Sequence, residues 1–272
     1  MRKLIIVLAM LASASAYAGR GATYQSIMDA IASNNGDAIA SELERAERLV
    51  CAMCVGPVME LLDHPDYRVR EVAAWWFARR PVLSAAVTMQ SIARMQGNDP
   101  VAAEYAADVV GSMRHTDVLP ILASMLKRTD FPAATKVAAV RAIGIISDPA
   151  GLPAVVGAFG DSTPETRAEA VRAYDSLRGD RSGNELVPLL GDGDVSVRRV
   201  STSIIAQFKV ASARTTLEGL LANDGDPIVR RNAALALMRL GDPASHAALQ
   251  QAADHDPIAF VRSTARAALA NR

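Results

Sequence analysis

The sequence predicts an all-α protein, a right-handed α-solenoid of about seven antiparallel helix pairs that follow an N-terminal helical cap. Three observations support this fold class: a pattern that recurs about every 32 residues, a helical spacing of apolar residues inside each copy, and an unusual composition. Half of the 272 residues are apolar, yet only 4% are aromatic. Such a chain suits closely stacked helices, because small side chains let helix backbones approach one another.

Residues 1–18 have the features of a cleaved signal peptide. Arg2 and Lys3 form a basic start, residues 4–11 form an apolar stretch, and small residues at Ala16 and Ala18 match the two positions that a signal peptidase recognises. The apolar stretch is too short to span a bilayer. We expect a soluble mature chain that begins near Gly19 in a bacterial periplasm.

The charge balance argues against a nucleic-acid partner. The sequence has 29 basic and 29 acidic residues, and loss of Arg2 and Lys3 with the leader leaves a net charge of −2. Proteins that bind nucleic acid usually carry a basic excess, because neutralisation of phosphates dominates their affinity.

A pattern recurs seven times between residues 48 and 272. In six copies a Val or Thr precedes a basic residue, and Ala102 and Ala103 take these places in the degenerate second copy. The six are Val69-Arg70, Thr135-Lys136, Thr166-Arg167, Val197-Arg198, Val229-Arg230 and Val261-Arg262. The small residues three positions later are spaced 33, 33, 31, 31, 32 and 32 residues apart. A period of roughly 20 to 50 residues indicates a repeat architecture.

Each copy contains an amphipathic helix, because positions zero, three, four, seven and ten after the basic residue share one helical face. An apolar stretch upstream predicts the first helix of each pair, as at 118–126, 152–159, 186–190 and 216–221. Asp-Pro turns at Asp99-Pro100, Asp226-Pro227 and Asp256-Pro257 are expected to end one helix and cap the next.

The N-terminal part, residues 19–47, matches no repeat. Helical periodicity over 26–31 and 38–50, on either side of a breaker at 34–36, predicts a cap that covers the open face of the first pair.

Residues 224–243, DGDPIVRRNAALALMRLGDP, carry the pattern most clearly, and here the chain resembles HEAT repeats of the short bacterial type called PBS-lyase HEAT-like. The resemblance covers about residues 48–272. It implies that an Asp six residues before each basic residue forms a ladder between stacked turns. The implied pairs are Asp130 and Lys136, Asp161 and Arg167, Asp192 and Arg198, Asp224 and Arg230, and Asp256 and Arg262. His64 and Gly97 replace the Asp in the first two copies.

Cys51 and Cys54 are the only cysteines in the chain. Three residues apart on a helix, their Cα atoms fall within reach of a disulfide, and two lone cysteines in an oxidising compartment usually pair. A stiffening disulfide is therefore the first interpretation. Free buried thiols, a redox-active pair, and a copper or zinc site completed by His64 or Met53 remain alternatives.

Trp75 and the charged residues at variable positions are the candidates for partner binding. Trp75 either packs against the cap or, with Arg79 and Arg80, anchors a partner, since interface hot spots favour Trp and Arg. The resemblance implies that second helices line a concave face, where charge would change from acidic to basic along the chain. The residues concerned are Glu71, Glu104 and Asp108, then Arg141, Arg172, Arg199 and Arg231.

Enzymes of HEAT-like families do not match. Some bind two irons through His-Glu pairs, and no His here precedes Glu. Phycobilin lyases act in the cytoplasm, which an export signal opposes, and HEAT-like DNA glycosylases need a basic concave face. No nucleophile elbow, phosphate-binding glycine loop or zinc-protease motif occurs. We therefore expect no catalytic residue, cofactor or metal.

The sequence favours a periplasmic, non-enzymatic scaffold that binds a protein of unknown identity and does not insert stably into a membrane. The alternative is an accessory protein of a redox or metal pathway that works through Cys51 and Cys54. The oligomeric state stays open, and a monomer is compatible with the sequence.

Overall fold

A computed structural model describes residues 21–179 and 181–270, and these residues form helices and turns without a strand. The expected leader, residues 1–18, lies outside the described residues. The chain divides into two compact units, whose described parts are residues 21–89 and 90–270. None of the described helices is both long and apolar enough to cross a membrane.

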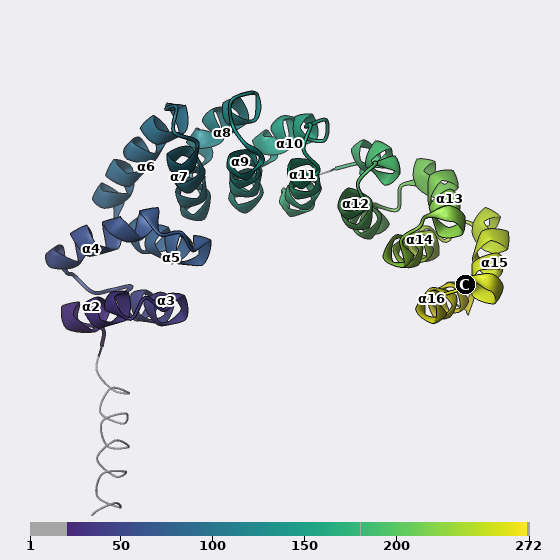
Figure 1. Ribbon diagram of the computed structural model, residues 1–272, viewed down its shortest axis with the longest axis horizontal. Helices are drawn as coiled ribbons and strands as arrows, with labels where there is room; N and C mark the ends of the chain where they lie inside the picture. The colour runs from purple at the N-terminus through teal and green to yellow at the C-terminus, as the bar shows by residue number, and fades with distance from the viewer. Residues whose placement is uncertain (1–20, 180, 271–272) are drawn as a thin grey trace, which may run out of the picture. The chain divides into compact units, whose positions relative to one another are not determined.

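The N-terminal unit holds two cap helices and the first helix pair (Figure 1). Its elements are α2 (Tyr24–Ala32), α3 (Gly36–Arg45), η1 (Ala52–Cys54), α4 (Val55–Glu60), η2 (Leu61–Asp63), α5 (Tyr67–Ala78) and the first half of α6 (Pro81–Gln96). Helix α3 packs against both α2 and α5. Side chains of Thr23, Asn35 and Asp66 cap α2, α3 and α5 by accepting backbone hydrogen bonds.

The expected helix over 38–50 ends earlier than predicted. Helix α3 stops at Arg45, and Cys51 is extended where an α-helix was expected, acting as the N-cap of the short 3-10 helix η1. The reason lies in Arg80, whose guanidinium donates hydrogen bonds to the carbonyls of Ala46, Glu47 and Leu49. These carbonyls therefore do not need the backbone N–H groups of a continued helix. The apolar periodicity of the segment could not reveal this distant donor.

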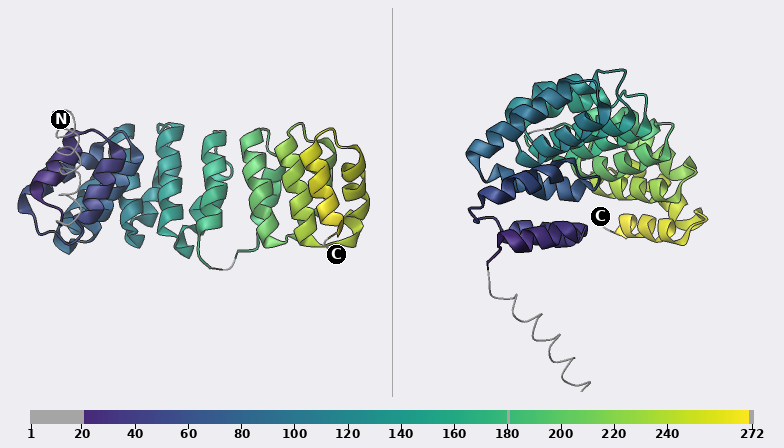
Figure 2. Two further views of the ribbon diagram at one scale, coloured as in Figure 1. Left: turned by 90° about the horizontal axis from the view of Figure 1, so that it is seen from below. Right: turned by 60° about the vertical axis from the view of Figure 1, so that its left-hand side comes forward.

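The C-terminal unit is a stack of helix pairs. The second helices are α7 (Pro100–Met113), α9 (Ala133–Ile146), α11 (Pro164–Ser176), α12 (Val195–Phe208), α14 (Pro227–Leu240) and α16 (Ala259–Ala270). The first helices are α8 (Leu119–Leu126), α10 (Leu152–Ala158), η5 (Asn184–Gly191), α13 (Arg214–Asn223) and α15 (His246–His255). In this unit each second helix packs against the next and lies on the inner side of the arc (Figures 1 and 2).

With the α4–α5 and α6–α7 pairs, the described residues form the seven helix pairs that the sequence predicts. In the C-terminal unit, short 3-10 turns lead into four of the first helices, at η3 (Thr116–Val118), η4 (Pro149–Gly151), η6 (Ala211–Ala213) and η7 (Pro243–Ser245). The stretch at 186–190 differs, because it is 3-10 rather than α-helical and contains Pro188, which has no backbone N–H to donate.

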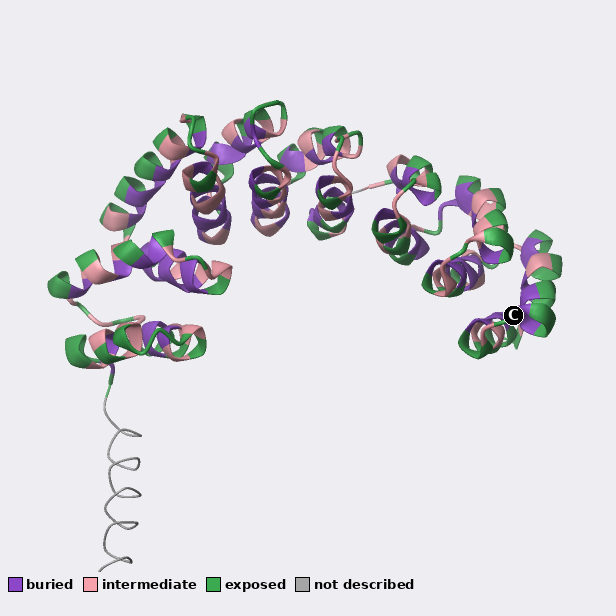
Figure 3. Cartoon of the chain, in the orientation of Figure 1, coloured by how far each residue is buried: buried purple, intermediate pink, exposed green. Residues whose placement is uncertain are grey.

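Small buried residues set the distance between neighbouring second helices. The residue three positions after the basic one is fully buried in all seven copies: Ala73, Ala106, Ala139, Ala170, Ser201, Ala233 and Ala265. Buried residues line the contact between the two rows of helices in the C-terminal unit, while exposed residues face outward (Figure 3). A Cβ on Gly111 would stand 2.7 Å from the Cα of Ala142, so α7 and α9 touch backbone to backbone there.

Replacement of Gly111 by Ala is expected to destabilise the C-terminal unit by about 2 kcal/mol, because the packed backbones must separate to admit a methyl group. Gly219 is the matched control, since a Cβ on this helical glycine meets nothing within 4 Å. Gly219→Ala should be neutral or stabilise by up to about 1 kcal/mol through helix propensity. Denaturant unfolding followed by far-UV circular dichroism measures both, and equal effects would contradict this packing.

The Asp-to-basic ladder joins neighbouring repeats. Each basic side chain pairs with the Asp of the following repeat, at 2.9 Å for Lys136–Asp161 and 2.7 Å for Arg167–Asp192, Arg198–Asp224 and Arg230–Asp256. The three Arg–Asp contacts are bidentate, through Nε and one terminal nitrogen. The same arginines, and Arg262, also donate to the backbone carbonyl of the Asp in their own repeat.

The first ladder pair is Lys136 with Asp161, so Asp130, in the same copy as Lys136, has no ladder partner. Asp130 has no basic residue in the preceding copy, where Ala103 stands, and is exposed and paired with Arg128. Arg128 also donates to the carbonyl of Gly97 and stacks 3.8 Å from the centre of the Phe131 ring. It therefore bridges the two repeats where the motif is broken, a role that the repeat pattern did not indicate.

The ladder carboxylates are nearly out of water. Between 3% and 8% of the four paired Asp side chains is exposed, against 9% to 19% of their basic partners. Hydrogen bonds from Arg167 lower the pKa of Asp192 despite its burial. At Asp161 and Asp256, burial acts to raise the pKa, but hydrogen bonds from Thr163 and Lys136, and from Arg230 and Ile258, outweigh it and leave both values lowered.

Loss of one ladder carboxylate should cost more than loss of an exposed one. Asp192→Asn leaves the Arg167 guanidinium without its counter-charge and is expected to destabilise the unit by about 3 kcal/mol at pH 7. Asp130→Asn, at the equivalent but exposed position, should cost less than about 1 kcal/mol.

The ladder effect should also depend on pH. Because the pKa of Asp192 is lower in the folded chain than its usual 3.8, its stabilisation is present above about pH 4 and disappears as the pH falls towards the folded value. The difference in unfolding free energy between wild type and Asp192→Asn should therefore shrink between pH 5 and about pH 2. A difference that is independent of pH would rule out the ion pair as its source.

Candidate functional site

The most exposed apolar side chains lie in the N-terminal unit. Among the described residues the four most exposed large apolar side chains are Val50 at 98%, Val82 at 85%, Met89 at 73% and Met53 at 67%, and all four lie within residues 21–89. The exposed large apolar residues of the C-terminal unit reach 52% at most. Apolar surface left in water in this way is typical of a contact site.

A pocket of about 640 Å³ opens beside this surface in the N-terminal unit. One wall is the non-helical segment after α3 together with the start of α4, and the other is the junction of α5 and α6. Its apolar lining is Leu49, Val50, Ala52, Val55 and Leu83, and its remaining lining is Glu47, Arg48, Cys51, Arg79 and Arg80. Pockets of about 270 and 500 Å³ in the C-terminal unit are smaller.

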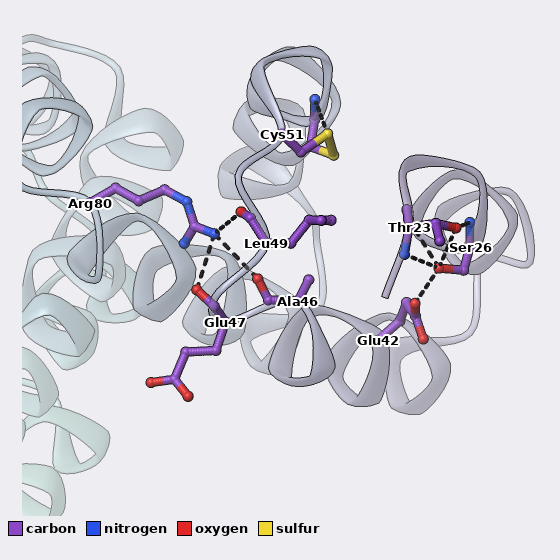
Figure 4. Close-up of a disulfide and its surroundings, with 9 residues drawn as sticks. Thr23, Ser26, Glu42, Ala46, Glu47, Leu49, Cys51 and Arg80 are labelled. Carbon is purple, nitrogen blue, oxygen red and sulfur yellow. Dashed lines mark hydrogen bonds between the residues drawn. A yellow bond between two sulfur atoms is a disulfide. The ribbon is translucent and has the colours of Figure 1, made fainter. Parts of the chain in front are cut away.

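Arg80 holds the wall of this pocket in place (Figure 4). Its guanidinium donates to the carbonyls of Leu49 at 3.0 Å and of Ala46 and Glu47 at 3.2 Å, and to the carbonyl of Trp76 at 2.6 Å. It also stacks 3.4 Å from the centre of the buried Trp76 ring. Burial lowers the pKa of Arg80, and the negative charge of Glu47 opposes this shift without outweighing it.

The charges around the pocket are unevenly distributed. Three of the six arginines between residues 21 and 89 line it, but only one of the nine acidic residues does, Glu47. Glu47 forms a 3.4 Å ion pair with Arg79, and both side chains are partly exposed. Arg48 is exposed and forms no ion pair with the described residues. The pocket is therefore locally basic in a unit that has more acidic than basic residues.

The two cysteine sulfur atoms lie 1.99 Å apart, at disulfide distance, with their Cα atoms 5.3 Å apart. Cys54 is fully buried, whereas Cys51 is partly exposed and lines the pocket. His64, considered as a metal ligand, accepts a hydrogen bond from the Asp66 N–H at its Nδ1 atom. In the described part of the chain no three His, Cys, Asp or Glu side chains gather so that they could hold a metal ion.

The structure brings Arg79 and Trp75 together, with the guanidinium 5.2 Å from the centre of the half-buried Trp75 ring. Arg80 was grouped with them as part of an anchor, but its guanidinium is committed to backbone carbonyls. Leu49, Val50 and Leu83 were missed as site residues. Their signal, a Leu-Val pair directly before the cysteines, was hidden in a stretch that has helical periodicity.

The predicted charge gradient of the C-terminal unit is largely neutralised within the stack. Asp108 is buried and accepts hydrogen bonds from Arg141 at 2.7 and 3.1 Å. Arg199 pairs with Asp226, whose pKa it lowers to about 2. Arg172 pairs with Glu169 in its own helix at 3.0 Å. Of the remaining partner candidates, Arg231 is exposed and Glu71 and Glu104 are half-buried, and they stay predictions.

Arg80→Met is expected to destabilise the N-terminal unit by roughly 3 kcal/mol, since four carbonyls lose a charged donor. Arg79→Met, next to it on a half-exposed side chain, should cost less than about 1 kcal/mol. Both tryptophans of the chain lie in α5, so fluorescence during unfolding reports on this unit, while circular dichroism reports on every helix. A fluorescence transition that is unchanged in Arg80→Met would contradict the role of Arg80.

Comparisons with known proteins agree with this architecture. No curated protein has a sequence that matches the chain. The structure is similar to that of the Escherichia coli protein YibA, with a TM-score of 0.57 and 16% identity, over 92% of this chain and 93% of that one. It is similar to a chain in the structure of Kap95p with RanGDP, with a TM-score of 0.57 and 15% identity, over 87% of this chain and 38% of that one. An engineered protein matches with a TM-score of 0.52 and 20% identity, over 86% and 74%.

These likenesses show the fold alone. The sequence itself matches the family model described as HEAT repeats at residues 88–175 and 183–270, which together exceed half of the chain. The ladder, the capped turns and the buried small residues all lie in these two segments or continue their pattern. This chain therefore belongs to the HEAT repeat family.

Proposed function

We propose that this chain is an exported, non-enzymatic scaffold that binds a protein partner through the pocket and the exposed apolar residues of its N-terminal unit. The observation that carries the proposal is a basic pocket lined by the 98% exposed Val50, in the unit that holds the four most exposed large apolar side chains of the described residues. When a partner covers these side chains, the apolar surface that leaves water favours binding by about 25 cal/mol per Å².

The C-terminal unit supports the proposal in a different way. Its charges are mostly paired inside the stack, and its ladder ties successive repeats together, as suits a semi-rigid support. A protein of similar fold, Kap95p, is described as binding RanGDP. A solenoid of this kind therefore has a surface that a protein can occupy, although a shared fold does not identify the partner.

The proposed location is the periplasm, reached through cleavage after Ala18. In that oxidising compartment Cys51 and Cys54 would persist as a disulfide. The bond joins the extended Cys51 to the buried Cys54, and Cys51 follows the segment that Arg80 holds. We propose that it stiffens the wall of the pocket and does not serve as a redox centre.

Photo-crosslinking in living cells tests this function. A photoreactive phenylalanine analogue placed at Val50, which lines the pocket, should form a protein–protein adduct that mass spectrometry identifies. The same analogue at Phe260, an exposed apolar position at 44% in the C-terminal unit, is the control. Trp75→Ala, at a half-buried position, should weaken the Val50 adduct at least about threefold without changing the melting of the chain.

The same samples test the proposed periplasmic location and the proposed disulfide between Cys51 and Cys54. The intact mass should correspond to a chain that starts at Gly19, and neither cysteine should react with an alkylating agent before reduction. Adducts at Phe260 but not at Val50 would overturn the assignment of the surface. A chain that retains residues 1–18 would overturn the proposed export. Alkylation of the cysteines without reductant would overturn the proposed disulfide.

A further inference from the structure

The arginines of the pocket differ in what neutralises them. Arg79 has Glu47 as a partner at 3.4 Å. Arg80 is bound by carbonyl oxygens alone, and Arg48 is exposed, so neither of these two has an ion pair among the described residues. Carbonyl dipoles orient a guanidinium but leave its full positive charge. The pocket thus holds two guanidinium groups that form no ion pair next to an apolar wall, and the nearby Glu47 carboxylate acts on Arg80 only through its charge.

We infer that this pocket binds a segment of the partner protein in which a carboxylate lies next to an apolar side chain. The inference rests on the proposed function and states the chemistry of the partner. The carboxylate pairs with the exposed guanidinium of Arg48, and the apolar side chain packs against Leu49, Val50 and Leu83. A guanidinium matches a carboxylate with two parallel hydrogen bonds, which gives the contact direction as well as strength.

Charge distribution favours a single carboxylate over a large polyanion. Residues 21–89 contain nine acidic and six basic residues, so the unit as a whole repels a nucleic acid or an anionic membrane. The excess of positive charge is confined to the pocket, where it is effective only over about one Debye length, ~8 Å. A local acidic group in a short segment satisfies both conditions.

The apolar wall favours a protein segment over a small anion. Val50 lines the pocket yet is 98% exposed, and Met53 beyond it is 67% exposed. A free acetate or phosphate would neutralise an arginine but would leave these side chains in water. A segment with an apolar side chain beside its acidic group covers both parts of the surface. The volume of about 640 Å³ falls within the ~300–1,000 Å³ range of pockets that hold ligands of this size.

Selection from a random library of 12-residue displayed peptides against the full chain tests the inference. Enriched peptides should contain Asp or Glu, or a free terminal carboxylate, next to an apolar residue. One such peptide is then synthesised with Asp, Asn or Lys at the acidic position, and its binding is measured by fluorescence anisotropy. The Asn version should bind about tenfold more weakly than the Asp version, and the Lys version should bind still more weakly.

Matched variants locate the contact on the chain. Arg48→Glu and Val50→Glu should each weaken binding of the Asp peptide by about tenfold or more. Arg239→Glu, an exposed arginine in α14, and Val101→Glu, a 52% exposed position in α7 of the C-terminal unit, introduce the same changes elsewhere and should leave binding unchanged. All four sites are exposed, so circular dichroism should show the wild-type fold.

Three results would overturn the inference: equal binding of the Asp and Asn peptides, enrichment of basic peptides, or equal loss of binding in the control variants. Displacement of the peptide by sodium acetate at low millimolar concentration would show that a small anion suffices and would also overturn it. These failures are separate from failure of the proposed function. A Val50 adduct in cells together with charge-independent peptide binding would leave the scaffold intact and remove only the carboxylate.

Discussion

In the C-terminal unit a carboxylate of each ladder repeat is withdrawn from water, and the basic residue of the preceding repeat neutralises it. Removing a charge from water costs several kcal/mol unless a partner with good geometry compensates for it. The bidentate contacts, such as Arg167 to Asp192, supply that partner across the boundary between repeats. Because the same guanidinium also binds a backbone carbonyl of its own turn, the contact fixes both the position of the turn and the spacing to the next one. In these repeats the contact therefore sets the register in which the closely packed helices stack.

The N-terminal unit solves a related problem with different chemistry. At the ladder position the first copy has His64, and an arginine outside the motif, Arg80, holds the chain together by binding carbonyls of the segment after α3. Carbonyls that would have continued the helix are then satisfied by a side chain, so the segment leaves the helix in a turn. This non-helical segment forms a pocket wall and leaves Val50 in water. The ladder pairs each cation with a carboxylate, whereas this clamp leaves the Arg80 guanidinium bonded to carbonyls and without an ion pair.

The sequence predicted the fold well because repetition averages out local ambiguity. Small residues at one offset in seven copies could only mean stacked helices, and their complete burial confirms that inference. The ladder was predicted as a motif, but its direction, from one repeat to the next, needed the structure. The pocket was predicted only as a region, through the cysteines, Trp75 and the missing ladder. Its wall depends on one contact between residues more than thirty positions apart, Arg80 with Ala46, and no local pattern encodes such a contact.

Charged residues at variable positions show most clearly why pattern alone does not locate a binding surface. Asp108 and Arg141 occupy the same offset in consecutive copies, so stacking places them against each other, and each neutralises the other. Arg199 likewise meets Asp226 of the following copy, although the two residues occupy different offsets. A charge in a repeat protein is available to a partner only if the neighbouring repeat lacks its complement. By that criterion, most of the variable charges of the C-terminal unit are neutralised within the stack. The pocket of the N-terminal unit, in contrast, holds arginines without an ion pair next to apolar surface.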